Sequence, residues 1–253
     1  MFAEQGEIFI KVLEKRFQQA TREVEAVSKI LENQHVPAGG TILDVYCLTG
    51  RHAIGLAERG FKVVGVDISP VMIEHAKEFA RLRKAQDRTT FVVGDPRRIS
   101  HVFKNTQNRF DAILSMYTYL GSYGEKTDEK VLKQLRKLVA PHGIVLLELD
   151  NRDYIAHHLQ RTSIYHVDNM EYHVELRMNI ENSSMENTLS LYVKRGSDLE
   201  FKTQIEVEHR TYSLHEIISL LDRTGWTYIK SYGNFNLDPP SIDSPSLIVV
   251  GNA

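Results

Sequence analysis

Short apolar runs alternate with helical patterns along most of this chain, and this alternation restricts its fold more than any other feature. Runs suited to buried parallel strands cover residues 41–45, 62–66, 90–93, 110–115 and 144–149. Helical patterns between them cover residues 51–59, 71–83 and 128–139. Strands that alternate with helices predict a three-layer α/β fold with a mainly parallel sheet, whose ligands bind at the carboxyl ends of the strands.

Capping residues mark the boundaries of these helices. Ser69 followed by Pro70 is typical of a helix N-terminus, and Gly60 stands at the C-terminal cap of the preceding helix. Ser213 with Glu216 three residues later is a capping box, which predicts a helix over residues 213–224. The triplet Pro141-His142-Gly143 predicts a tight turn before the fifth strand.

The segments outside the alternation predict three additions to the sheet. Apolar side chains at helical spacing over residues 2–34 predict one or two leading helices. Residues 163–210 lose the helical period and alternate like strands, which predicts an antiparallel β insertion. Residues 226–232 and 246–250 predict a closing pair of strands. A length of 253 residues suits a single domain over 1–253.

Charge and composition restrict the partners. A formal net charge of -2 provides no basic field, so we expect no nucleic-acid partner. The single cysteine, Cys47, cannot form an intrachain disulfide, and no run approaches the about 18 apolar residues of a membrane span. We therefore expect a cytoplasmic protein, no membrane contact and a small partner.

The segment from residue 42 to residue 69 carries the clearest chemical signal. A strand with Asp44 near its end leads through a loop at Gly50 into a helix, and Asp67 closes the next strand, where a carboxylate can accept both hydroxyls of a ribose. This arrangement resembles the first two motifs of class I S-adenosylmethionine-dependent methyltransferases. The resemblance implies a Rossmann-like methyltransferase fold with S-adenosylmethionine as cofactor.

The same resemblance implies roles for further residues. Gly94-Asp95-Pro96 resembles the next family motif, in which an acidic residue meets the adenine amino group, and Ser115 with Met116 would neighbour the methionine part of the cofactor. The expected cofactor-binding residues are Asp44, Tyr46, Gly50, Asp67, Ile68, Asp95, Pro96 and Ser115. Asp95 could alternatively be a turn residue.

The loop departs from the family pattern at Tyr46 and Leu48, where glycine is common. Glycine suits such a loop because the backbone must turn sharply and approach the ligand closely. A leucine with positive φ would cost about 1–3 kcal/mol or displace the ligand. The departure is harmless if both side chains turn away from the ligand. Cys47, inside the loop, is expected to be a packed residue.

Methyl transfer from a sulfonium is an in-line displacement, which needs a base only if the nucleophile arrives protonated. Tyr117 and Tyr119 could face the methyl donor, and Tyr119 is the one catalytic candidate, with packing as its alternative role. The candidate bases are His52, His166, His173 and His209, and their spacing distinguishes none of them. We expect no metal, because no cluster has ligand spacing.

The resemblance extends over about residues 36–253 and leaves residues 1–35 as a helical lid. It predicts a methyltransferase for a small-molecule acceptor, with an insertion that either roofs the substrate pocket or forms the contact of a homodimer. Two alternatives remain. An inactive binding or regulatory subunit is favoured by Tyr46 and Leu48 and opposed by Asp67 and Asp95. A dinucleotide oxidoreductase is opposed by the missing G-x-G-x-x-G loop.

Overall fold

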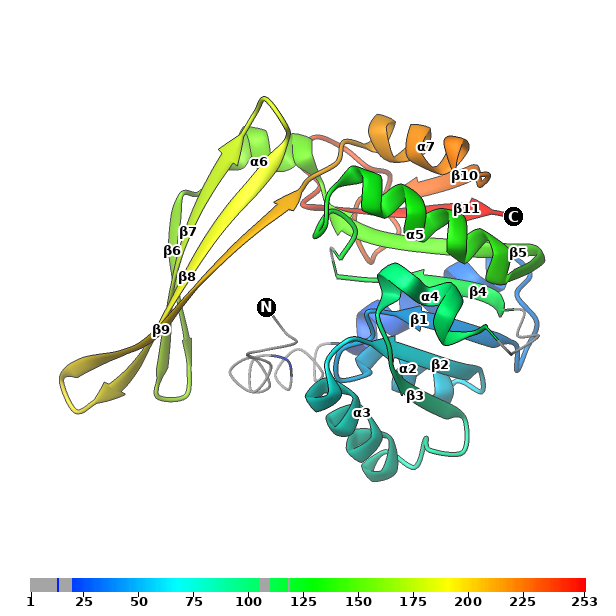
Figure 1. The fold of residues 1–253 in the computed structure, drawn as a ribbon, viewed down its shortest axis with the longest axis horizontal. Coiled ribbons are helices and arrows are strands. Elements are labelled where there is room, and N and C mark those ends of the chain that lie inside the picture. Colours follow the sequence, from blue (N-terminus) through cyan, green and yellow to red (C-terminus); the bar gives the residue numbers. More distant parts are fainter. Residues whose placement is uncertain (1–12, 14–19, 105–109, 118) are drawn as a thin grey trace.

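The computed structural model describes residues 13, 20–104, 110–117 and 119–253. Its centre is a seven-stranded sheet with the order β10-β11-β5-β4-β1-β2-β3 (Figure 1). The strands are β1 (Thr41–Val45), β2 (Lys62–Asp67), β3 (Thr89–Val93), β4 (Phe110–Ser115), β5 (Val139–Asp150), β10 (Thr227–Tyr232) and β11 (Ser246–Asn252). Strands β1 to β5 pair in parallel, and β11 pairs antiparallel with both β5 and β10.

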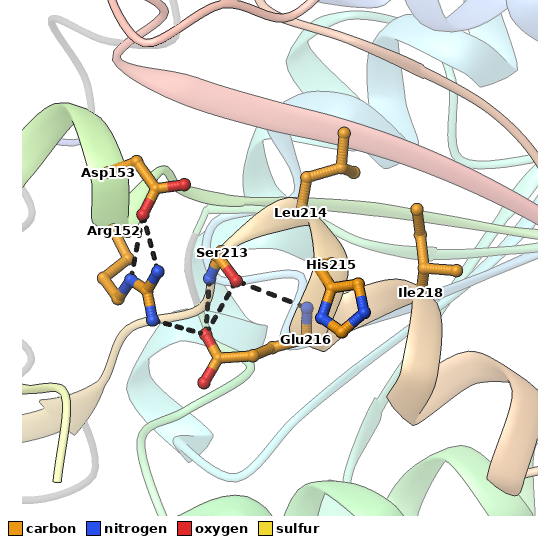
Figure 2. Close-up of a pocket in the computed structure, with 7 residues that line it drawn as sticks. All are labelled: Arg152, Asp153, Ser213, Leu214, His215, Glu216 and Ile218. Atoms are coloured by element: carbon orange, nitrogen blue, oxygen red, sulfur yellow. Dashed lines mark hydrogen bonds and ion pairs between the residues drawn. The ribbon is translucent and has the colours of Figure 1, made fainter.

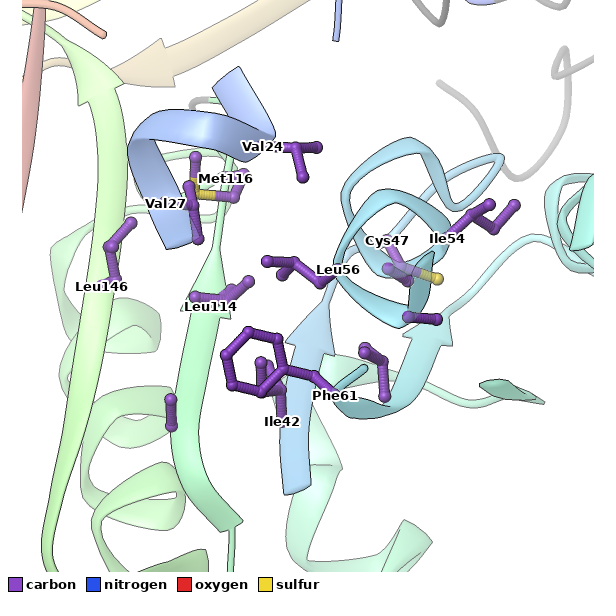
Figure 3. Close-up of a cluster of buried hydrophobic side chains, with 14 of the residues drawn as sticks. Val24, Val27, Ile42, Cys47, Ile54, Leu56, Phe61, Leu114, Met116 and Leu146 are labelled. Carbon is purple, nitrogen blue, oxygen red and sulfur yellow. The ribbon is translucent and has the colours of Figure 1, made fainter. Parts of the chain in front are cut away.

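Helices cover both faces of this sheet, which confirms the predicted three-layer architecture. They are α2 (Arg51–Glu58), α3 (Pro70–Leu82), α4 (Ile99–Val102), α5 (Glu125–Leu138), α6 (Arg152–His158) and α7 (Leu214–Arg223), with a 3-10 turn η1 (Pro96–Arg98) before α4. On one face, α2 and α3 join a core with Ile42, Leu114 and Leu146 of the sheet (Figure 3). On the other, α4, α5 and α7 join a core with Leu43 and Val145.

Residues 20–33 form a helix that belongs to the first of these cores. Val27 and Ile30 are fully buried, and a Cβ at Gly55 of α2 would lie 2.6 Å from Val24. The leading helix is therefore confirmed over this range and covers the sheet directly. Of residues 1–19 the structure describes Leu13 alone, so the other part of the predicted lid lies outside the described residues and the lid stays a prediction.

The insertion is a separate antiparallel sheet with the order β6-β7-β8-β9, standing to one side of the α/β unit in Figure 1. Its strands are β6 (Thr162–Val167), β7 (Met170–Asn179), β8 (Ser184–Arg195) and β9 (Asp198–Arg210), close to the predicted range of 163–210. The pairs Met185–His209, Asn187–Val207 and Leu189–Ile205 point to one face, because side chains alternate along a strand. We call this the inner face; Glu186, Glu206 and Glu208 point to the other.

Two element boundaries and three short elements differ from the sequence expectations. The fifth strand begins at Val139, and the predicted turn over 141–143 is an irregularity within it: Val139 pairs with Phe110, but Ile144 pairs with Ala112. Helix α5 begins at Glu125 after Gly124, whose φ of 78° ends the preceding loop. The short elements η1, α4 and α6 were not predicted, because one or two turns carry too little hydrophobic period to recognise.

Candidate active site

The loop from β1 to α2 has left-handed backbone conformations, with positive φ, at two residues that are not glycine. Tyr46, Leu48 and Gly50 have φ values of 59°, 51° and 78°. Backbone bonds fix this path, from Cys47 N to Val66 O at 3.2 Å and from Gly50 N to Cys47 O at 2.9 Å. The positive φ considered for Leu48 is therefore present, and each non-glycine residue in this region costs about 1–2 kcal/mol, which the surrounding contacts must offset.

The side chains of Tyr46 and Leu48 are buried over this loop. The Tyr46 ring stacks on Tyr119 with centroids 4.6 Å apart and 4° between the planes. Leu48 lies in an apolar cluster with Leu13, Met72 and Ile205, against which Tyr117, Tyr119, Leu189 and Val207 also pack. The packing alternative for Tyr119 is thus observed, while its catalytic role stays a prediction. Burial raises the pKa of Tyr119 well above its ordinary value.

Two predicted cofactor carboxylates, Asp44 and Asp67, lie at the carboxyl ends of β1 and β2 and are each 1% exposed. Asp67 accepts hydrogen bonds from the N–H of Ser69 at 2.9 Å and of Leu48 at 3.1 Å, and burial raises its pKa. Oδ2 of Asp44 has no hydrogen-bond partner among the described residues. Burial raises the pKa of Asp44, the charge of Arg51 opposes this and the nearby Asp67 adds to it, and the net result is a pKa of about 7.

The remaining predicted residues line the same edge. Asp95 caps η1 by accepting from Arg97 N at 2.9 Å and pairs with the Arg97 guanidinium at 2.8 Å, so its turn role is also observed. Burial acts to raise the pKa of Asp95, but the hydrogen bonds and charge of Arg97 hold it below its ordinary value. Pro96 is buried in η1, Ile68 is half-buried, and Ser115 ends β4 beside Val45 at 4% exposure.

A charged cluster beside the loop was not predicted. Glu23 accepts from Arg51 Nε at 3.1 Å and contacts His52 Nε2 at 2.8 Å. Burial and Arg51 lower the pKa of His52 to about 4, so this candidate base is neutral near pH 7 and supports Glu23.

Glu148 accepts from Tyr117 N at 2.5 Å, and burial raises its pKa to about 7. Glu148 is an acidic residue near the carboxyl end of the fifth strand, and the same feature of the sequence identified Asp44 and Asp67.

The other candidate histidines differ in their surroundings. His166 and His173 pair with Glu171 at 3.4 and 2.6 Å and have side chains 67% and 38% exposed. His209 lies on the inner face with 14% of its side chain exposed, and its Nε2 is 3.7 Å from Asp150 Oδ2 at the end of β5. The structure therefore brings His209 alone of these three to the carboxyl edge of the central sheet.

A surface pocket of about 620 Å³ lies away from this site, at the N-terminus of α7 (Figure 2). The predicted capping box is confirmed there: Ser213 Oγ accepts from Glu216 N at 3.3 Å, and Glu216 accepts from Ser213 N at 2.9 Å. Arg152 bonds Asp153 and Glu216 at 2.7 and 3.1 Å, so these charges are compensated within the pocket. None of its lining residues belongs to the predicted cofactor set.

The raised pKa values of Asp44 and Glu148 predict that the free energy of unfolding falls as pH rises from 5.5 to 8. Both groups have pKa values of about 7 in the folded protein, against 3.8 and 4.5 as reference values. At these two sites the folded state therefore binds more protons in this window, and their contribution to stability is lost as pH rises through 7, by a few kcal/mol at most. His52, with its pKa lowered to about 4, acts in the opposite direction and offsets part of this loss below pH 6.5. Glu23, with its pKa lowered to about 2, is ionised in both states throughout.

Urea unfolding at both pH values measures this change, and Asp44→Asn, which cannot ionise, is expected to flatten the profile. A free energy of unfolding that stays constant or rises between pH 5.5 and 8 in the unsubstituted protein would contradict the assignment.

No helix among the described residues is long and apolar enough to cross a membrane. The described residues also contain no group of three or more His, Cys, Asp or Glu side chains that could hold a metal.

Comparison with known proteins agrees with this geometry. Residues 42–143 match the family described as "Methyltransferase domain". A protein named as a methyltransferase, YqeM of Bacillus subtilis (strain 168), is 26% identical over 214 residues, which cover 84% of this chain and 83% of that protein.

Two solved structures have the same fold. An S-adenosylmethionine-dependent methyltransferase from Clostridium acetobutylicum ATCC 824 has a TM-score of 0.80 at 14% identity and covers 99% of this chain and 98% of its own. CalS10 of Micromonospora echinaspora, an amino pentose methyltransferase with bound S-adenosylmethionine, has a TM-score of 0.67 at 16% identity and covers 91% and 90%.

The matched segment contains the loop and the acids that end β1, β2 and β3, and nothing in the comparisons favours an inactive subunit or a dinucleotide oxidoreductase. Residues 42–143 accordingly form a methyltransferase domain, and the chain has the fold of S-adenosylmethionine-dependent methyltransferases, so it is a methyltransferase with S-adenosylmethionine as its cofactor.

Proposed function

We propose that this enzyme methylates a small-molecule acceptor held beneath the inner face of the antiparallel sheet. The supporting observation is that Leu189, Ile205 and Val207 of this face share one apolar cluster with Leu48 of the cofactor loop. The insertion thus covers the carboxyl edge of the central sheet. A covered, mainly apolar site suits a small ligand and excludes water from the displacement.

The side chains of the site fit the cofactor chemically. The unpartnered Oδ2 of Asp44 suits an ammonium group, the carboxylate of Asp67 suits a ribose diol, and Asp95 suits an aromatic amino group. The bound cofactor would supply an electrophilic methyl group on its sulfonium. The chain itself binds, orients and shields: Ser115 ends β4 beside Val45 of β1, and Met116 follows it.

Side chains must move before a ligand reaches these acids, because Asp44 and Asp67 are each 1% exposed. The stacked rings of Tyr46 and Tyr119 and the buried Leu48 cover the loop between β1 and α2. We infer that cofactor entry separates the two rings. The departure from glycine at these positions then affects access to the site rather than its chemistry.

The acceptor assignment draws support from CalS10, which methylates an amino pentose and has the same fold over most of both chains. The formal net charge of -2 also disfavours a polyanionic acceptor.

Pairing of two chains as a homodimer and a cytoplasmic location stay predictions. Exposed apolar side chains on the insertion, including Ile164 at 55% and Phe201 at 54%, are where we expect a homodimer contact.

Transfer of a tritiated methyl group to a fractionated extract of the source organism tests the proposal. The enzyme is incubated with methyl-labelled S-adenosylmethionine and either the small-molecule filtrate, the protein fraction or the RNA fraction. We expect label in the filtrate alone. Label confined to protein or RNA, or no label above that obtained with Asp67→Ala, would overturn the small-molecule assignment.

A further inference from the structure

Two polar side chains interrupt the apolar inner face of the insertion, Asn187 on β8 and His209 on β9. Their strand partners, Val207 and Met185, are apolar. Oδ1 of Asn187 and Nε2 of His209 are shielded from solvent, and neither atom has a hydrogen-bond partner among the described residues. Buried polar atoms usually find partners, so two unpartnered atoms on one face indicate a missing ligand.

His209 reaches the central sheet where β9 meets the end of β5. Its Nε2 lies 3.7 Å from Asp150 Oδ2, too far for a hydrogen bond but close enough for a charge on the ring to be stabilised. Arg210 N bonds Gly121 O at 2.9 Å, which fixes the end of β9 against the loop after β4. The position of His209 therefore depends on β9, on the end of β5 and on the loop after β4.

The charges that face this region are mainly negative. From β5 come Asp150 and, two residues earlier on the same side of the strand, Glu148. From β8 comes the uncharged Asn187, and from α2 comes Arg51, whose guanidinium carbon lies 5.2 Å from the Tyr117 ring centroid. Arg210, next to His209, forms an ion pair with Glu216 at 2.5 Å and so does not compensate these charges. A ligand group placed here meets two carboxylates, an imidazole and an amide oxygen.

We propose that the acceptor is a primary or secondary amine and that His209 removes its proton, with Asn187 holding a second N–H of a primary amine. This inference rests on the proposed function above. Alkylamines have pKa values near that of lysine, about 10.4, and so arrive protonated at pH 7 without a free electron pair. Glu148 and Asp150 attract such a cation.

The chemical step balances without any further reactant. The ammonium gives one proton to Nε2 of His209, and the freed electron pair on nitrogen forms the new bond to the methyl carbon. The electron pair of the broken carbon–sulfur bond returns to sulfur. Asp150 then stabilises the imidazolium. A hydroxyl acceptor has one proton and no charge, so it would leave Asn187 Oδ1 without a donor and the negative charge of the two carboxylates uncompensated.

The charge of the labelled product tests the acceptor class without knowledge of its identity. The product from the small-molecule filtrate is loaded on a cation exchanger in acid and eluted with ammonia. Unreacted labelled cofactor is separated from the product before loading, so that its own charge does not enter the readout. We expect the label to bind in acid and to leave in ammonia, because an N-methylamine loses its charge there.

Label that passes the column in acid would overturn the amine assignment but leave the small-molecule function standing, as would label retained in ammonia, since a permanently charged product needs no base. Label found only in protein or RNA would overturn the proposed function itself. The failures of the two proposals are thus separate outcomes.

Substitution of His209 tests its role with the same filtrate. We expect His209→Gln to lower kcat about 10²-fold at pH 7, since glutamine cannot accept the proton, and to leave the stabilisation by S-adenosylhomocysteine unchanged. The deficit should shrink as pH approaches the pKa of the amine, because free amine needs no base. His173→Gln is the matched control: His173 also lies beside a carboxylate, Glu171, but on the other face.

Equal rates for His209→Gln and His173→Gln, or a deficit that stays constant with pH, would overturn the base assignment. Asn187→Leu fills the same face without an acceptor atom, and we expect it to raise KM about 10-fold for a primary amine with a smaller change in kcat. An unchanged KM would remove Asn187 from the proposal.

Discussion

Replacing Asp67 with alanine is expected to weaken binding of S-adenosylhomocysteine by about 10²-fold or more. The proposed site loses the two charge-assisted hydrogen bonds that a carboxylate can make to a ribose, each contributing about 1.5–3 kcal/mol. Isothermal titration calorimetry measures the dissociation constant directly. Asp87→Ala, at an exposed turn residue, is the control and should bind as the unsubstituted enzyme does.

Asp67 also accepts the backbone N–H of Leu48 and of Ser69, so the loop itself could account for a loss of binding. Asp67→Asn separates the two causes, since its remaining oxygen still accepts one of these bonds while the carboxylate is gone. Weak binding in both variants supports the ribose role. Weak binding in Asp67→Ala alone would assign Asp67 to loop support, and unchanged binding in both would remove it from the site.

Replacing Leu48 with glycine is expected to lower the free energy of unfolding while strengthening cofactor binding. Loss of a side chain that is 2% exposed costs about 2–5 kcal/mol, and relief of the left-handed backbone returns about 1–2 kcal/mol, so destabilisation prevails. Removal of the side chain opens a path to Asp67, which should lower the dissociation constant of S-adenosylhomocysteine.

Comparison with Leu48→Ala isolates the backbone contribution. Both variants lose the packing, but only glycine accepts a φ of 51° freely, so Leu48→Gly should be about 1 kcal/mol more stable than Leu48→Ala in urea unfolding. At Leu82, exposed at the end of α3, the order should be the usual one, with alanine more stable. Alanine more stable than glycine at position 48 would contradict the strain argument.

The sequence predicted those parts of the fold in which hydrophobic period and capping agree. The strand at Thr41–Val45, the Ser69-Pro70 helix start and the Ser213–Glu216 capping box are found where expected, because each depends on residues close in the chain. The bulge in β5 was not foreseen, since it depends on how Val139 and Ile144 register with the neighbouring β4.

The site was predictable to a similar extent. Asp44 and Asp67 could be placed because the carboxyl ends of parallel strands share one edge of a sheet. His209 could not be distinguished from His173, because the face of each depends on the pairing of strands within the insertion. Asp150 becomes significant only when β9 brings His209 to it, a contact between residues far apart in the chain.

The two ends of the antiparallel sheet leave and rejoin the α/β unit side by side. Asn151 forms a β-bridge with Tyr212, and the N–H of Arg152 bonds the carbonyl oxygen of Tyr212 at 3.1 Å. Asn151 directly precedes α6, and Tyr212 lies shortly before α7. The whole excursion from Arg152 to Thr211 therefore begins and ends at one anchored point, and it adds no strand to the central sheet. If the insertion covers the acceptor as proposed, exchanging this segment for that of a related enzyme should change acceptor choice while the central sheet keeps its register.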